Sequence, residues 1–297
     1  MSAKAYALKP SPVYLIICGL VFTTLALFIG YKIWQYLYAY NTSVAHAFLG
    51  GSAAAIATAL GTLPILFSRE LSVRSQDTML GFGAGVMLAA CSFSLIIPGI
   101  DAMRNQGAGA WLSGAVISAS ILLGAALMFL MERYIPHEHF VKGIEGQNAQ
   151  TIRRTWLFVF AIALHNIPEG LAIGVGFGGG NTVQGSALAA GISIQDMPEG
   201  LVVAVALFAA GYKRTTAVLL GIASGLVEPA GAVIGALVIN LSNMLLPWGL
   251  GFAAGAMLFV ISHEMIPESH RKGHEAHATG GLIIGFVIMM LLDTALS

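Results

Sequence analysis

The chain has 297 residues, of which 57% are hydrophobic and only 9% are charged, and its formal net charge is zero. Its mean hydropathy is +0.82, whereas about a quarter of the residues in a soluble domain are charged. These values exclude an ordinary soluble domain, offer no basic tract for nucleic acid, and indicate an integral membrane protein.

A membrane-spanning helix needs about 20 mostly apolar residues, and the chain contains nine such runs between polar or Gly/Pro-rich turns. They are 13–38, 45–67, 78–99, 111–131, 156–178, 185–210, 214–239, 248–268 and 280–296. The first run follows Lys4 and Lys9, as the apolar core of a signal peptide would. It is too long for such a core and ends without a clear small-residue cleavage site. We therefore expect an all-α polytopic membrane protein of nine transmembrane helices.

Basic residues in short loops mark the cytoplasmic side of a membrane protein. With a cytoplasmic N-terminus, the inner segments contain Lys4, Lys9, Arg69, Arg74, Arg133, Lys142, Arg153, Arg154, Lys213, Arg214, Arg271 and Lys272. The outer loops contain only Arg104, and Lys32 lies within the first span. This asymmetry predicts a cytoplasmic N-terminus, a periplasmic C-terminus, and large cytoplasmic loops at 132–155 and 269–279.

Two pairs of similar segments indicate an internal repeat. GFGAGVMLAACSFSLI (81–96) and GFAAGAMLFVISHEMI (251–266) are identical at 8 of 16 aligned positions. Shared composition of small-residue helices is an alternative, but the common order of GF, AG and ML favours a repeat. HNIPEG (165–170) and QDMPEG (195–200) also lie on adjacent spans of opposite direction. The pattern predicts an inverted repeat, in which many secondary transporters place a midplane binding site.

Polar side chains gather at the middle of three spans. They are His165, Asn166 and Glu169 in the fifth span, Gln195, Asp196 and Glu199 in the sixth, and Glu228 in the seventh. Residues three or four apart share one face of a helix, so each motif presents its polar groups on roughly one side.

The charges in this group need a partner. One charged side chain at the bilayer centre costs about 2.5–3.5 kcal/mol, so the four carboxylates together cost about 10 kcal/mol, and no Lys or Arg lies at their depth. Protons, a bound cation or both must compensate. One imidazole, two amides and no thiolate favour a divalent metal, with zinc suited and cadmium, manganese, iron(II) or nickel tolerated. Pro168, Pro198 and Pro229 predict kinks beside these residues. A single histidine or proline in a membrane helix could instead serve helix packing and have no role in metal binding.

The succession of HNIPEG after a long inner loop, QDMPEG on the next span and LVEP on the one after resembles the ZIP (Zrt/Irt-like protein) family, and is most similar to its bacterial GufA-type branch. The resemblance covers residues 45–297 and is weakest at LVEP. Residues 1–44 would add one helix to an eight-helix core. The resemblance to this family implies import of zinc, cadmium, and also iron or manganese, across the bacterial inner membrane by alternating access. It further implies a homodimer in lipid, no enzymatic activity and no organic cofactor.

The resemblance also implies a binuclear metal centre for the transported Zn²⁺ or Cd²⁺. His165, Glu169, Gln195 and Glu199 would form one site; Asn166, Asp196 and Glu228 would form the other; Glu169 and Glu199 would bridge them. Many eukaryotic members have histidine where this chain has Gln195 or Asp196, so the metal preference does not transfer. Met87, in the repeated segment, is either a soft ligand or an adaptable packing residue.

Weaker candidates lie toward the membrane surfaces. Asp101 and Asp293 are expected at the outer entrance, and Glu132, His263 and Glu264 on the inner side. His270, His274 and His277 could pass metal to cytosolic acceptors or belong to an ordinary polar loop.

Two other classes of function remain open. A passive channel would use the same ligands but would barely saturate. An intramembrane metalloenzyme would need a motif such as HExxH, whereas HNIPE holds one histidine and HEMIPESH spaces its two by seven. Proton coupling is also open, because a carboxylate that loses its metal takes up protons.

Overall fold

The structure is a computed structural model that describes residues 12–67, 72–134, 166–209 and 212–296, and its described elements are all helical. The α-helices are α1 (Pro12–Tyr40), α2 (Thr42–Thr62), α3 (Val73–Ala89), α4 (Ile97–Asn105), α5 (Ala110–Tyr134), α7 (Thr182–Ala209), α8 (Arg214–Gly225), α9 (Val227–Leu241), α10 (Leu246–Val260), α11 (Ile266–Ser269) and α12 (Glu275–Leu296). Residues 166–178 form a further helix, the 166–178 helix. Short segments are η1 (Leu63–Leu66), η2 (Ala90–Ile96), η3 (Asn243–Leu245) and η4 (Ile261–Met265).

Within the described residues, seven helical stretches are long and apolar enough to cross a membrane. They are Thr42–Leu66, Val73–Asn105, Ala110–Met131, Thr182–Val205, Arg214–Leu241, Leu246–Ser269 and Glu275–Ala295. Each coincides with one of the predicted spans. Of the remaining two predicted spans, 13–38 lies within α1, and 156–178 is described only from residue 166. A polytopic helical membrane protein is thereby confirmed.

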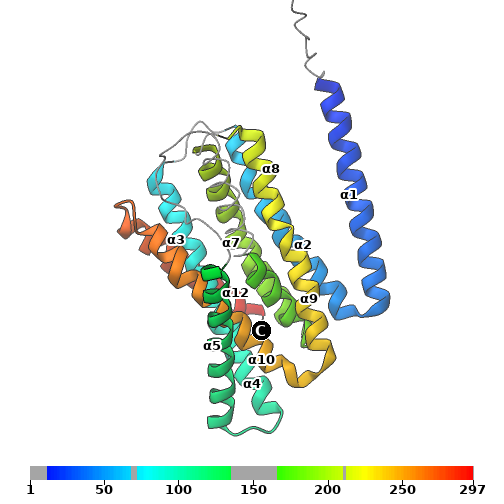
Figure 1. Cartoon of the computed structure of the whole chain (residues 1–297), viewed down its shortest axis with the longest axis vertical. Coiled ribbons are helices and arrows are strands. Elements are labelled where there is room, and N and C mark those ends of the chain that lie inside the picture. The colour runs from blue at the N-terminus through cyan, green and yellow to red at the C-terminus, as the bar shows by residue number, and fades with distance from the viewer. Residues whose placement is uncertain (1–11, 68–71, 135–165, 210–211, 297) are drawn as a thin grey trace, which may run out of the picture.

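The helices pack in two groups that α7 joins. α2 packs along α7 and α9, whereas α3 packs along α12 and α10 packs along α5. α7 also contacts α3 and α12, so it lies between the two groups. α1 stands apart from the bundle at the right of Figure 1, and its main contact is with α2.

Close helix crossings in the two halves of the chain use equivalent residues. Gly85 of α3 lies against the backbone of Leu282 in α12, and Gly255 of α10 lies against the backbone of Ile121 in α5. Gly85 and Gly255 are aligned in the sequence repeat. A Cβ at either position would collide with the facing backbone, so the repeated glycines fix the same close crossing twice.

The glycines that end the two hexapeptide motifs also lie at close helix crossings. Gly170 closes the first motif and lies against the backbone of Glu228, and Gly200 closes the second and lies against the backbone of Thr58. Thr58 and Glu228 are separated along the chain by the same number of residues as the paired glycines Gly85 and Gly255. The two motif helices therefore cross α2 and α9 at equivalent points.

Helix geometry changes near several of the prolines. α3 and α10 each pass into a π-helical segment, η2 and η4, which leads directly into the proline-containing helices α4 and α11. π-helical turns are rare and often occur at functional sites. α7 continues as one helix through Pro198. α8 and α9 are separated by a break at Leu226, beside the motif residue Glu228, and Pro229 lies in the first turn of α9.

Candidate metal centre

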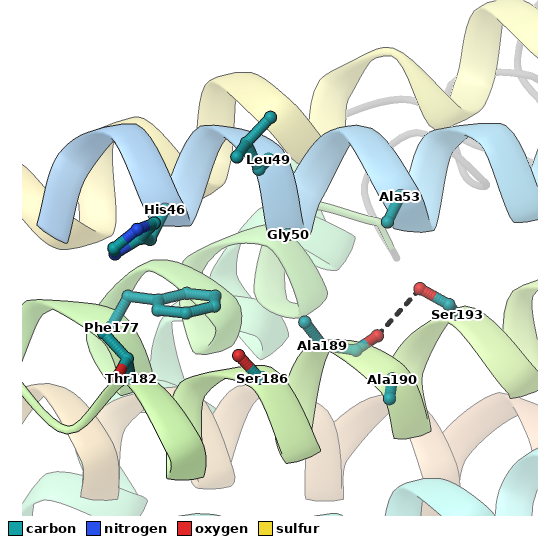
Figure 2. A pocket seen from close by; sticks show the side chains of 10 residues that line it. All are labelled: His46, Leu49, Gly50, Ala53, Phe177, Thr182, Ser186, Ala189, Ala190 and Ser193. Carbon is teal, nitrogen blue, oxygen red and sulfur yellow. Dashed lines mark hydrogen bonds between the residues drawn. The ribbon is translucent and has the colours of Figure 1, made fainter. Parts of the chain in front are cut away.

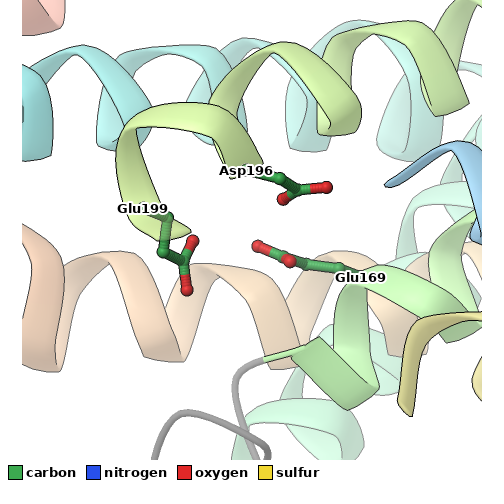
Figure 3. A group of neighbouring side chains, drawn as sticks. All are labelled: Glu169, Asp196 and Glu199. Atoms are coloured by element: carbon green, nitrogen blue, oxygen red, sulfur yellow. The ribbon is translucent and has the colours of Figure 1, made fainter. Parts of the chain in front are cut away.

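Three carboxylates from the two motif helices meet in the interior of the bundle. Asp196 and Glu199 lie one turn apart on α7, and Glu169 projects from the 166–178 helix toward them (Figure 3). One oxygen of each lies within 4.8 Å of the others. Glu169 and Asp196 are each 1% exposed, so this concentration of negative charge is held away from water.

Gln195 joins two of these carboxylates. Its side-chain amide nitrogen donates to Oε1 of Glu169 and lies 3.3 Å from Oδ1 of Asp196. The opposite amide orientation would turn its carbonyl oxygen against two carboxylates, so the electrostatics select the orientation with nitrogen toward them. Gln195 is fully buried and offsets part of the repulsion between Glu169 and Asp196.

Glu228 is held from two sides. The side-chain amide of Asn166 and the hydroxyl of Thr58 each donate to its Oε1, at 3.1 Å in both cases. Glu228 lies in the first turn of α9 and is fully buried, as are Asn166 and Thr58 to within 3%. The sequence analysis did not single out Thr58, whose only signal was a hydroxyl in the middle of an apolar helix.

Four buried oxygens of this group have no hydrogen-bond partner among the residues that the structure describes. They are Oε2 of Glu169, Oε1 of Gln195, Oδ2 of Asp196 and Oε2 of Glu228. Leaving one buried polar atom unsatisfied costs about 1–3 kcal/mol, and more for a charged group. Among the described residues, no Lys or Arg forms an ion pair with Glu169, Asp196 or Glu228. Carboxylate and amide oxygens are ligands for divalent cations, so the chemistry of these oxygens fits a cationic cargo.

Two predicted ligands are not placed in this cluster by the described contacts. His165 lies outside the described residues, as do residues 135–155 of the predicted inner loop. Met87 is buried in α3, at 1% exposure, within the main hydrophobic core. Both stay predictions.

The two acidic residues expected at the outer entrance share a cavity. Asp101 and Asp293 both line a cavity of about 740 Å³, together with Asn105, Asn181 and Gln184. Oδ1 of Asp293 accepts a hydrogen bond of 2.5 Å from Ser94 of η2. Asp101 has a side chain that is 59% exposed and lies 3.9 Å from Arg104. The cavity thus gathers carboxylate and amide groups from α4, α7 and α12.

The residues expected on the inner side are less closely grouped. His263 is exposed on η4 and stacks on Phe259, with ring centroids 5.1 Å apart, whereas Glu264 is half-buried. Glu132 lies in the last turn of α5. The three histidines near α12 are not equivalent. Both ring nitrogens of His270 lie within hydrogen-bonding distance of neighbouring groups, with Nε2 3.1 Å from Thr279.

His274 instead joins a buried carboxylate that the sequence analysis missed. Its Nδ1 lies 3.0 Å from Oδ2 of Asp77, a fully buried residue of α3. His277 is exposed one turn further along α12. The Asp77–His274 pair therefore fastens the segment between α11 and α12 to the start of α3.

A second cavity lies between α2 and α7. It measures about 490 Å³, and Figure 2 shows His46 and Phe177 at one end and Ser193 at the other. The Ser193 hydroxyl bonds to the carbonyl of Ala189, which satisfies it within its own helix. None of the cluster carboxylates lines this cavity, so it is distinct from the candidate metal centre.

The fold is that of a polytopic helical membrane protein, and its interior holds a cluster of three acidic side chains that could bind a metal ion. The family model described as ZIP Zinc transporter matches residues 137–293. The chain belongs to this family.

Curated relatives resemble the chain over most of its length. Zinc transporter ZIPB of Bordetella bronchiseptica is 51% identical over 253 residues, which are 85% of this chain and 82% of that protein. Zinc transporter GufA of Myxococcus xanthus is 47% identical over 243 residues, 82% of this chain and 96% of that protein. Zinc transporter ZIP11 of Homo sapiens is 30% identical over 337 residues, an alignment that covers 86% of this chain and 98% of that protein.

Proposed function

We propose that this protein imports zinc and similar divalent metal ions, including cadmium, iron and manganese, across the bacterial inner membrane into the cytoplasm. The observation that supports this proposal most directly is the set of four buried oxygens on Glu169, Gln195, Asp196 and Glu228 that find no hydrogen-bond partner within the described part of the chain. Their cost in the metal-free state is offset when a cation binds, and the similarity to proteins named as zinc transporters supports zinc as that cation.

We infer two adjacent cation positions in this centre. The cluster of Glu169, Asp196 and Glu199 would hold ions together with His165 and Gln195, while Glu228 and Asn166 would complete the second position with Asp196. Glu169 and Glu199 would bridge the two ions. The hydrogen bonds that divide the group into a Gln195-centred part and a Glu228-centred part support this division.

The proposed topology has nine spans, a cytoplasmic N-terminus and a periplasmic C-terminus. It rests on the distribution of basic residues and is compatible with the matched helix crossings of an inverted repeat. In this orientation the cavity of Asp101 and Asp293 opens to the periplasm and serves as the entrance, and metal leaves past Glu264, His263 and Glu132. Alternating access moves the ion between these two sides, and a homodimer in lipid is the proposed assembly.

The test uses purified protein in liposomes that contain a zinc indicator. The native chain should take up zinc with a saturable rate, and Glu169→Gln combined with Glu199→Gln should lower uptake to the level of empty vesicles. Glu275→Gln, an exposed carboxylate at the start of α12, is the matched control and should keep native uptake. Native uptake by the double variant would contradict the proposal.

The same vesicles separate a carrier from a channel. A carrier saturates with zinc concentration because each cycle needs a conformational change, whereas a channel rate rises almost linearly. If uptake is linear but still depends on Glu169 and Glu199, the proposed metal site stands, and the protein is a selective channel that does not use alternating access.

A further inference from the structure

The hydroxyl of Thr58 occupies a special position in the repeat. Gly200 of the second motif crosses α2 at Thr58, and Gly170 of the first motif crosses α9 at Glu228. The two crossing points are equivalent, yet one carries a carboxylate and the other a hydroxyl. The repeat therefore brings a fourth helix, α2, to the metal centre without adding a further negative charge.

The contacts of Thr58 show what this hydroxyl can do. Its single proton has two acceptors in reach, Oε1 of Glu228 at 3.1 Å and the carbonyl of Ala54 at 3.3 Å. The carboxylate is nearer, and hydrogen bonds to charged acceptors are stronger. Thr58 therefore donates to Glu228 when that group is ionised, in competition with the back-bond to Ala54 that a buried threonine otherwise makes.

Two donors on one oxygen orient the whole carboxylate of Glu228. Asn166 from the 166–178 helix and Thr58 from α2 both donate to Oε1, whereas Oε2 is buried and accepts no hydrogen bond from any described residue. We propose that Thr58 is a positioning residue of the second cation position, where its hydroxyl and the Asn166 amide fix Oε1 so that Oε2 faces the cation. This inference rests on the proposed function and names a residue on which one of its two cation positions depends.

The test measures equilibrium zinc binding to the purified full chain in detergent, with stoichiometry and both affinities. The native chain should bind two zinc ions. Groups that orient metal ligands typically contribute about 10- to 100-fold to metal affinity. Thr58→Val should therefore lower the affinity for one of the two zinc ions by that factor and leave the affinity for the other unchanged. Uptake should show a raised KM for zinc.

The chain offers matched controls for this measurement. Thr58→Ser keeps the hydroxyl and should restore both affinities. Thr62→Val removes a buried hydroxyl one turn further along α2, which bonds to the carbonyl of Ala59, and should bind both ions as the native chain does. Valine has nearly the same shape as threonine, so the contact of residue 58 with Gly225 changes little in Thr58→Val. Thr58→Ala is the second variant if Thr58→Val fails to fold, with the same expected loss.

The outcomes separate this inference from the function on which it rests. A native chain that binds one zinc ion or none contradicts the proposed two-ion centre. A native chain that binds two ions while Thr58→Val and Thr58→Ala bind two with unchanged affinity overturns only the role of Thr58. An equal loss at both ions in Thr58→Val that Thr58→Ser fails to restore also overturns it, because that result reports a general packing defect.

Discussion

Gln195 on α7 donates its amide hydrogen to Glu169 on the neighbouring helix, and the same nitrogen faces Asp196. A single neutral amide thus lies between two carboxylates. A hydrogen bond to a charged acceptor contributes about 1.5–3 kcal/mol to stability. Its loss should lower the stability most when no cation is bound to the two carboxylates.

Gln195→Glu should therefore lower the melting temperature of the chelator-treated protein and enlarge the rise in melting temperature on adding zinc. The substitution removes the donor and adds a carboxylate, whose charge a bound zinc ion offsets. Thermal unfolding with chelator and with zinc measures both quantities. Gln184→Glu, on the same helix in the outer cavity, is the control with little expected change. Unchanged melting of metal-free Gln195→Glu would show that the amide does not relieve the repulsion.

Gly200→Ala should destabilise the protein and impair zinc binding, because the added Cβ collides with the backbone of Thr58. α7 and α2 must then separate, which displaces Asp196 and Glu199 from the centre. Gly114→Ala is the matched control, since nothing lies within 4 Å of its Cβ position in α5. Alanine is favoured over glycine inside a helix by about 1 kcal/mol, so the control should melt at or above the native temperature. Equal melting of the two variants would refute the close crossing.

Asp293→Asn should raise the zinc concentration for half-maximal uptake several-fold, with a smaller change in maximal rate. Asp293 is half-buried in the outer cavity and tied to Ser94, so its charge is screened less than that of an exposed group. Asp101→Asn should have a weaker effect, because Asp101 is exposed beside Arg104. Zinc uptake kinetics at low and high salt measure the effects of both substitutions. A larger effect of Asp101→Asn than of Asp293→Asn would contradict this prediction.

Asp77→Ala should loosen the segment between α11 and α12 without abolishing zinc binding. Removal of the carboxylate leaves His274 without its 3.0 Å partner. Amide hydrogen exchange across residues 270–275 should become faster, while exchange in α7 stays as in the native chain. Thr78→Ala is the neighbouring control, because the Thr78 hydroxyl donates to the carbonyl of Arg74 within α3. Slow exchange in Asp77→Ala would mean that other contacts hold the segment.

The acidic cluster of the candidate metal centre was predictable because charged residues are rare in the apolar spans. Glu169, Asp196, Glu199 and Glu228 stood out by their cost, and the structure brings the first three together. Thr58 carries no charge, and a threonine in a membrane helix is ordinary, so only its distance to Glu228 shows its place. His165 lies outside the described residues and stays a prediction.

Helix ends and long-range pairs were less predictable. The span expected at 78–99 extends in the structure from Val73 to Asn105, because helical hydrogen bonding continues past the apolar core into polar residues. Asp77 lies in that polar extension, where a charge is unremarkable, and its partner His274 is 197 residues away. Neither local periodicity nor composition carries information about such a pair.

α1 meets the bundle chiefly through α2, and a single residue outside the helices, Asn41, connects the two. Asn41 also caps the first turn of α2 by accepting from the backbone of Ser43 and Val44. The connection between the two helices is therefore short and capped, and we expect α1 to follow rotations of α2. A fluorophore at Tyr36, which is 76% exposed, would then report rotations of α2 without replacing any side chain of the carboxylate cluster.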